Sequence, residues 1–260
     1  PGESGYARVM KVSPLLGVLS LFCTQVTACI WISEINLDGR KVEVGEEALY
    51  FNREGLLKEK AGDWKSRLPE FEARMAKSPT VQNRSDYAGV LVHLGEFAKA
   101  RDILVEAERL EPGSYAVAAN LGTTYELLGE NTKALEWIRK GMERNPRSHG
   151  GTEWVHVKIL EAKVELEKDR GWLESRSVVG ADFGGEPRPR LVKGKGPDAL
   201  ELIHAIGMQL RERVKFVKAP DPLVGDLLFD LGNGFAVRGA VETAAGVYSL
   251  AEEYGTPRDE

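Results

Sequence analysis

One pattern of residues occurs twice between Val81 and Ser148, at a spacing of 34 residues. The residues that punctuate each copy recur in register: Gly95 with Gly129, Ala100 with Ala134, and Pro112 with Pro146. Each copy carries the signals of a helical hairpin: a glycine where the first helix needs a left-handed ending, a small residue where two helices approach, and a proline after the second helix. Self-similarity at this period is typical of proteins that stack one supersecondary unit on the next. The repeat therefore predicts an all-α fold with helices over 81–94, 98–110, 115–128 and 132–144.

These residues resemble the tetratricopeptide repeat (TPR) family, which has small or apolar residues at positions seven, eight and eleven, Gly at fifteen, Ala at twenty and Pro at thirty-two. A third copy starts at Gly225 and matches at seven positions: Leu231, Gly232, Phe235, Gly239, Ala244, Tyr248 and Ala251. It begins 110 residues after the start of the second copy at Tyr115, so other material is interposed between the two copies. The resemblance implies a TPR-like helical-hairpin solenoid with a long irregular insertion before the last repeat.

The sequence outside the repeats suggests five segments: 1–28 as a leader, 29–79 as a tether and degenerate helical cap, 80–168 as TPR repeats, 169–197 as an irregular loop, and 198–260 as C-terminal helices including the third repeat. In the second segment, 30–44 shows no helical period, and a turn is expected over 36–39. Helical spacing recurs over 46–59, and again after Asp63, a candidate N-cap. Pro69 marks either the start of that second helix or a kink in it.

The region after the second repeat breaks the period. A helix capped by Thr152 begins in register, but its apolar residues continue to Leu166, past the position where a turn should fall. Glycines and prolines then exclude a long helix from 169–197. Within this stretch, Val178, Val179 and Phe183 could pair as a small strand or pack as a plug. Trp154 and Trp172 either fill the core or close, with the loop, over one end of a groove.

The insertion also carries local positive charge, from Arg188, Arg190, Lys193 and Lys195. Two interpretations stay open: a solvated loop, or a surface that contacts an acidic partner or lipid headgroups.

The N-terminus has the pattern of a secretory leader. Met10-Lys11 precedes an apolar run over 14–22, and Val26-Thr27-Ala28-Cys29 is similar to a bacterial lipobox. That resemblance implies lipidation at Cys29 and a location in the cell envelope, facing the periplasm. An uncleaved membrane anchor or a cleaved signal that releases a secreted protein are the alternatives. Residues 1–9 precede the expected initiator, Met10.

The composition limits the classes of function. The 260 residues carry a net charge of −5, which argues against nucleic-acid binding because that needs a basic face. The sequence contains no Gly-x-Ser-x-Gly, P-loop or His-Glu-x-x-His motif, so we expect no enzyme, cofactor or metal site. Glu153 and His156, three residues apart, could form an acid–base or metal pair, although a surface ion pair is the simpler interpretation. With Cys23 inside the leader and Cys29 at its cleavage site, a cysteine metal cluster is excluded.

The TPR resemblance implies a concave groove lined by the first helix of each hairpin. The groove positions carried over to this chain give these candidates: Gln82, Ser85, Val92, His93, Ala119, Thr123, Glu126, Leu127, Asp226, Phe229 and Asn233. Ser85 and Gly89 stand where TPR proteins that grip a carboxylate use Lys and Asn, so such a clamp is not expected.

Together with the leader and the stretch 151–163, the repeats make the chain similar to bacterial TPR lipoproteins. That likeness implies a protein–protein interaction scaffold of the envelope, binding a protein or peptide partner. The alternatives are an enzyme or enzyme subunit with a site in 149–197, and a purely structural part of an envelope assembly.

Overall fold

The computed structural model describes residues 32–35, 37, 39–44, 63–186, 188–192 and 196–256. The chain divides into two compact units, Pro1–Ile30 and Trp31–Glu260, and every element below belongs to the second. The leader, Cys29 and the helix predicted over 46–59 lie outside the described residues.

A pair of strands precedes the helices where the sequence suggests a tether. β1 (Ile32–Ile35) pairs antiparallel with β2 (Lys41–Val44), and Leu37, inside the stretch 36–39 where a turn is expected, lies in a turn. Apolar and polar residues alternate in β2, but each strand has four residues, too short a run for a period of two to stand out. The strand pair shows that this part of the predicted tether segment contains ordered structure.

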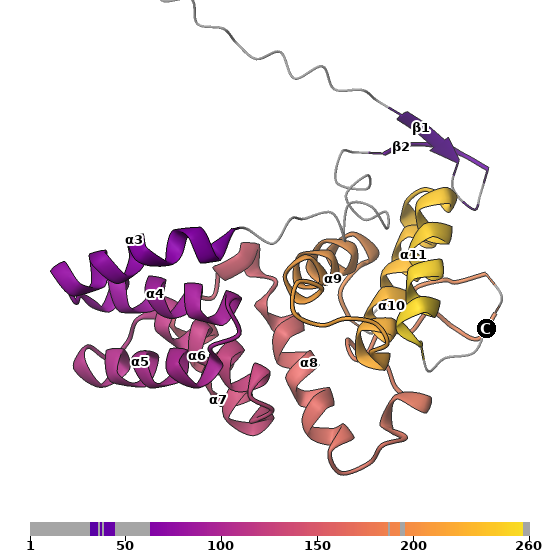
Figure 1. The fold of residues 1–260 in the computed structure, drawn as a ribbon. Helices are drawn as coiled ribbons and strands as arrows, with labels where there is room; N and C mark the ends of the chain where they lie inside the picture. The colour runs from indigo at the N-terminus through magenta and orange to yellow at the C-terminus, as the bar shows by residue number, and fades with distance from the viewer. Residues whose placement is uncertain are drawn as a thin grey trace, which may run out of the picture. The chain divides into compact units, whose positions relative to one another are not determined.

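Helices make up the rest of the described elements, and Figure 1 shows successive helices packing against one another. Their bounds are α3 (Trp64–Lys77), α4 (Val81–His93), α5 (Phe97–Leu110), α6 (Tyr115–Leu127), α7 (Asn131–Arg144), α8 (Glu153–Leu166), α9 (Ala199–Arg213), α10 (Pro222–Arg238) and α11 (Val241–Tyr254), with short 3₁₀ turns η1 (Ser148–Gly151) and η2 (Trp172–Glu174). The all-α prediction is confirmed. The four repeat helices differ from their predicted bounds by one residue at most.

The hairpins repeat at the level of contacts as well as sequence. A Cβ placed on Gly122 would lie 2.4 Å from Cδ1 of Ile138, and one placed on Gly232 would lie 2.5 Å from Cε1 of Tyr248. Both pairs join position eight of one helix to position twenty-four of the next. In the first hairpin the same positions hold Ala88 and Leu104, both fully buried. The third copy therefore keeps the TPR register inside its hairpin.

The turns between the paired helices are less uniform. Gly95 and Gly129 end α4 and α6 with φ of +81° and +77°, the left-handed conformation that the sequence predicts. Gly239, at the equivalent position of the third copy, has φ of −112°. α10 starts at Pro222, before the repeat itself begins, so the first helix of the third hairpin is longer. The turn at the other end of this helix also differs from those of the first two hairpins.

The capping helix α3 begins as expected. Oδ1 of Asp63 accepts a hydrogen bond from the backbone N of Ser66 at 3.1 Å, which satisfies one of the free amides of the first turn. The helix runs through Pro69, so the alternative start at that proline is wrong.

α8 is shared by two apolar cores. One core fills the hairpins α4–α7 and includes Leu160; the other fills the C-terminal helices and includes Ile159. Adjacent residues of one helix thus face opposite cores. This explains why its apolar residues continue past the point where a turn would end an ordinary repeat.

The insertion is anchored in the second core. Val178, Val179 and Phe183 are all buried there, which favours the plug over the strand. Two buried carboxylates of α10 hold this segment: Asp226 accepts from the backbone N of Val178 at 2.8 Å, and Asp230 accepts from Oγ of Ser177 at 2.7 Å. A wholly solvated loop is therefore wrong for this part of the insertion.

Candidate functional site: a pocket between the first two hairpins and α9

The inner faces of α4 and α6 form one side of a pocket with a volume of about 370 Å³. α8 forms a second wall, and α9 with the turn after it closes the opposite side. We call this space the groove pocket. It is lined by Gly89, Val92, His93, Tyr115, Ala116, Ala119, Asn120, Thr123, Glu126, Leu127, His149, Glu153, His156, Lys163, Met208, Gln209, Glu212, Arg213, Phe216 and Val217.

Six of the predicted groove residues meet in this pocket: Val92, His93, Ala119, Thr123, Glu126 and Leu127. Gln82 is exposed in the first turn of α4, where its Nε2 donates to Asp86. Ser85 is buried, and its Oγ accepts from Nδ2 of Asn120 on α6 at 3.0 Å. Ser85 therefore joins two helices of the array instead of facing the pocket.

The candidates from the third repeat lie elsewhere. Asp226 is fully buried against Val178, and Asn233 accepts a hydrogen bond from the hydroxyl of Tyr248 at 2.7 Å. Phe229 packs against the second core, with its ring 5.6 Å from that of Tyr248. The insertion and α9 cover α10, so the third hairpin does not extend the groove of the first two.

A buried carboxylate forms the centre of the pocket wall. Oε1 of Glu126 lies 2.6 Å from Nη1 of Arg213 and 2.7 Å from Nζ of Lys163. Its Oε2 lies 2.8 Å from Nε2 of His156. The Glu126 and Arg213 side chains are 5% and 7% exposed. This one residue therefore joins α6 to both α8 and α9.

A second buried carboxylate, Glu153, sits between two histidines. Oε2 lies 2.5 Å from Nδ1 of His149, and Oε1 lies 3.1 Å from Nδ1 of His156. The surface ion pair expected from the sequence is wrong, because the Glu153 side chain is 5% exposed. Residues 149–151 all have a left-handed backbone conformation, which folds His149 back toward the first turn of α8.

The charged groups in this cluster shift one another's pKa values. Burial alone would raise the pKa of Glu153, but hydrogen bonds from His149 and His156 outweigh it and lower the pKa to about 2. Burial likewise opposes ionisation of Glu126, yet Arg213 and His156 hold its pKa well below the usual value. For His156, burial favours the neutral ring, and hydrogen bonds to Glu126 and Glu153 reverse this and raise the pKa.

An aromatic stack forms one end of the pocket. The His93 ring lies 4.2 Å from the Trp64 ring and 5.3 Å from the Phe216 ring, measured between centroids. Partial burial, with a smaller effect from Lys215, lowers the pKa of His93. The stack connects α3, α4 and the turn after α9.

The pocket residues on α9 were missed because hydrophobic spacing within a helix does not reveal which helix lies opposite. One local signal was available. Arg213 continues the buried spacing of Ile206 and Leu210, and a charged residue on an apolar face requires a buried partner.

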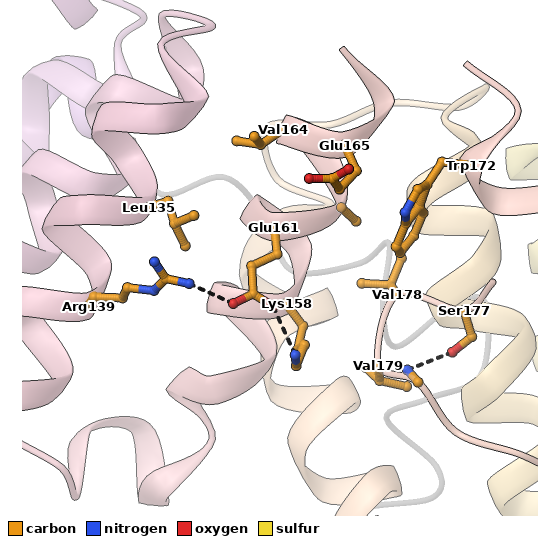
Figure 2. Close-up of a pocket in the computed structure, with 12 residues that line it drawn as sticks. Leu135, Arg139, Lys158, Glu161, Val164, Glu165, Trp172, Ser177, Val178 and Val179 are labelled. Atoms are coloured by element: carbon orange, nitrogen blue, oxygen red, sulfur yellow. Dashed lines mark hydrogen bonds and ion pairs between the residues drawn. The ribbon is translucent and has the colours of Figure 1, made fainter. Parts of the chain in front are cut away.

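A second pocket, of about 480 Å³, lies between α7, α8 and the insertion. Figure 2 shows Arg139 and Lys158 both paired with Glu161, at 2.7 and 2.8 Å, while Trp172 and Val178 face them from the other side. Trp172 and the insertion therefore line this space and not the groove pocket. The hypothesis that they close the groove is wrong; α9 does so.

The cluster of histidines and glutamates has no geometry suited to a metal: within the described residues, no group of three or more His, Cys, Asp or Glu side chains could hold an ion. None of the described helices is both long enough and apolar enough to cross a membrane.

Neither a family model nor a curated protein matches this chain. Among solved structures, it is similar to the crystal structure of a tetratricopeptide repeat protein from Parabacteroides merdae, at 16% identity and a TM-score of 0.33. The alignment covers 81% of this chain and 94% of that chain. An overall similarity at this level carries no weight here. The TPR-like fold follows from the hairpins and their repeated contacts.

Proposed function

We propose that this chain is a protein–protein interaction scaffold that binds a segment of another protein in the groove pocket. The observation that carries the proposal is the convergence of six residues, chosen for their repeat positions alone, on one cavity. Helix faces that converge on a groove are a common site for peptide segments.

The lining indicates what kind of segment fits. Val92, Ala119, Leu127 and Phe216 offer apolar contact, and charged groups lie along the α8 wall. A volume of about 370 Å³ lies near the lower end of the range for ligand pockets, roughly 300–1,000 Å³. The pocket therefore suits a few side chains of a partner and not a whole helix.

The test is partner capture from detergent-solubilised membranes with a pocket-filling variant. Ala119→Trp places an indole in the pocket and should abolish capture. Val105→Trp is the matched control, because Val105 is 43% exposed on α5 and is not among the pocket residues. Equal capture by both variants would reject the groove pocket as the binding site. Tight co-purification that neither variant disturbs, with no binding of a free peptide, would instead favour a structural part of an assembly.

The alternative of an enzyme with Glu153 and His156 as its catalytic pair has less support. A general base needs a free lone pair within reach of substrate. Both ring nitrogens of His156 already face carboxylates, and its side chain is 9% exposed. We therefore propose a non-catalytic role, without a cofactor. A hydrolase activity destroyed by His156→Ala would overturn this.

We further propose that Cys29 carries a lipid anchor and that the folded part faces the periplasm of a bacterial envelope. The lipobox-like sequence Val26–Cys29 supports this. The Cys29→Ala variant should leave the membrane fraction while keeping its helical content. Membrane association that survives this change would contradict the anchor.

A further inference from the structure

The two ring nitrogens of His156 each face an acceptor. Nδ1 lies 3.1 Å from a Glu153 oxygen on the same helix, and Nε2 lies 2.8 Å from a Glu126 oxygen on α6. A neutral imidazole carries one N–H, so it can satisfy one of these contacts, whereas the imidazolium satisfies both. The geometry therefore requires the charged ring.

Glu153 depends on the same charge. Within the described residues, the hydrogen bonds of Glu153 go to His149 and His156. Both histidines can lose their charge, so among the described residues the buried Glu153 carboxylate contacts no permanently charged partner. Glu126 differs, because Arg213 and Lys163 also pair with it.

The segment next to Glu153 has a backbone that needs such support. His149 has φ of +47°, and Gly150 and Gly151 have φ of +68° and +84°. A left-handed backbone is unfavourable for a residue that carries a Cβ atom, as histidine does. The contact to Glu153 and the bond from the Thr152 hydroxyl to the His149 carbonyl, at 2.8 Å, hold it in place.

We propose that residues 148–156 form a pH-operated gate on the groove pocket, closed while His156 is an imidazolium and released when it loses its proton. His149, Glu153 and His156 line the pocket, so their release opens one wall. The claim that the gate controls partner access rests on the proposed function. The charge state of His156 and the opening of residues 148–156 do not depend on it.

Other titratable groups also face this cluster. They are Glu126 and Tyr115 from α6, Lys163 from α8, and Glu212 and Arg213 from α9, with His204 beside Gly150. Arg213 opposes the charge on His156, and Glu212 favours the charge on His149.

The sign of the effect follows from linkage. A histidine whose pKa is raised by folding stabilises the folded arrangement fully below its ordinary value of 6.5 and loses that contribution as the pH rises through the folded value. The gate is therefore closed below pH 6.5 and opens as the pH rises through the raised pKa of His156.

The direct test is nitrogen NMR of the full chain, labelled with ¹⁵N-histidine, in detergent. His156 should show both ring nitrogens protonated at pH 6.5 and should lose a proton only as the pH rises above that ordinary histidine value. The His156→Gln variant assigns the signal. A neutral His156 at pH 6.5 would overturn the proposal.

Hydrogen exchange tests the opening itself. After correction for intrinsic rates, exchange of 148–156 should rise about tenfold for each pH unit through the folded pKa of His156, while α4–α7 stay unchanged. His156→Gln should show the open level at every pH, and Glu143→Gln, at an exposed position of α7, should behave as wild type. A uniform change along the chain, or none, would refute the gate.

Partner capture separates this inference from the proposed function. Capture should increase above the His156 pKa in wild type and become independent of pH in His156→Gln. No capture at any pH, with the NMR and exchange results as stated, would reject the proposed function and leave the gate standing. Opening without any change in capture would overturn the control of access.

Discussion

Oε1 of Glu126 lies 2.6 Å from Nη1 of Arg213, a residue 87 positions further along the chain, and both side chains are buried. This contact ties the second hairpin to α9 and fixes one side of the groove pocket. A buried ion pair contributes little when compared with apolar residues of the same shape, but removing one partner leaves an uncompensated charge.

We therefore predict that Arg213→Met or Glu126→Gln alone lowers the free energy of unfolding by about 3–5 kcal/mol, and that the double variant loses less than the sum. Denaturant unfolding of the four proteins measures this coupling. Arg109→Ala is the control: its pair with Glu106 is exposed, so this variant should unfold as the wild type does. Strictly additive losses would show that the buried pair has no energetic role.

The lowered pKa of Glu153 predicts that the free energy of unfolding decreases at acidic pH. Its pKa falls from 4.5 in the unfolded chain to about 2 in the folded one, so the ionised carboxylate stabilises the fold above pH 4.5 and this contribution is lost as the pH falls toward 2. The loss should be about 2–4 kcal/mol. Glu153→Gln should flatten this part of the profile, whereas Glu143→Gln, on the exposed face of α7, should not. Identical profiles for all three would contradict the buried pairing.

Gly122 tests the packing inside a hairpin. Gly122→Ala should destabilise the protein by about 1–3 kcal/mol, because the new methyl would meet Ile138 at 2.4 Å and Ile138 is 1% exposed. Gly89→Ala is the matched change in α4, where nothing lies within 4 Å; it should stabilise by about 0.5–1 kcal/mol. Thermal unfolding distinguishes the two. Equal effects would mean that the close approach of α6 and α7 is absent.

Phe183 tests the plug. Phe183→Ala should cost about 3–5 kcal/mol, as expected for an aromatic side chain removed from a core. Glu186→Ala, at an exposed position of the same insertion, should change stability by less than about 0.5 kcal/mol. For the same reason, deleting 176–195 should unfold the C-terminal helices. Full helicity after that deletion would reject the plug.

Much of the fold was predictable because its signals are local. Gly95, Gly129 and the alanines between the helices fix hairpin turns and close approaches within one repeat, and the structure places those helices within a residue of their expected bounds. Position eight against position twenty-four even carries over to the third copy, at Gly232 and Tyr248.

Only one side of the groove pocket could be predicted from the sequence. Glu126 and Ala119 follow from repeat position, since every first helix presents the same face. The opposite side depends on where α9 packs after a long insertion, and no local pattern encodes that. Arg213 and Phe216 were therefore missed, and Asp226 was misplaced because the insertion covers its face of α10.

The central claim is that the groove pocket is the working surface, and site-specific photocrosslinking tests it most directly. A photoreactive residue at Leu127, which lines the pocket, should crosslink to a partner in membranes. The same photoreactive residue placed at Leu110, which is 50% exposed on α5 and absent from the pocket lining, should not crosslink to the partner. Crosslinks at Leu110 with none at Leu127 would contradict the account.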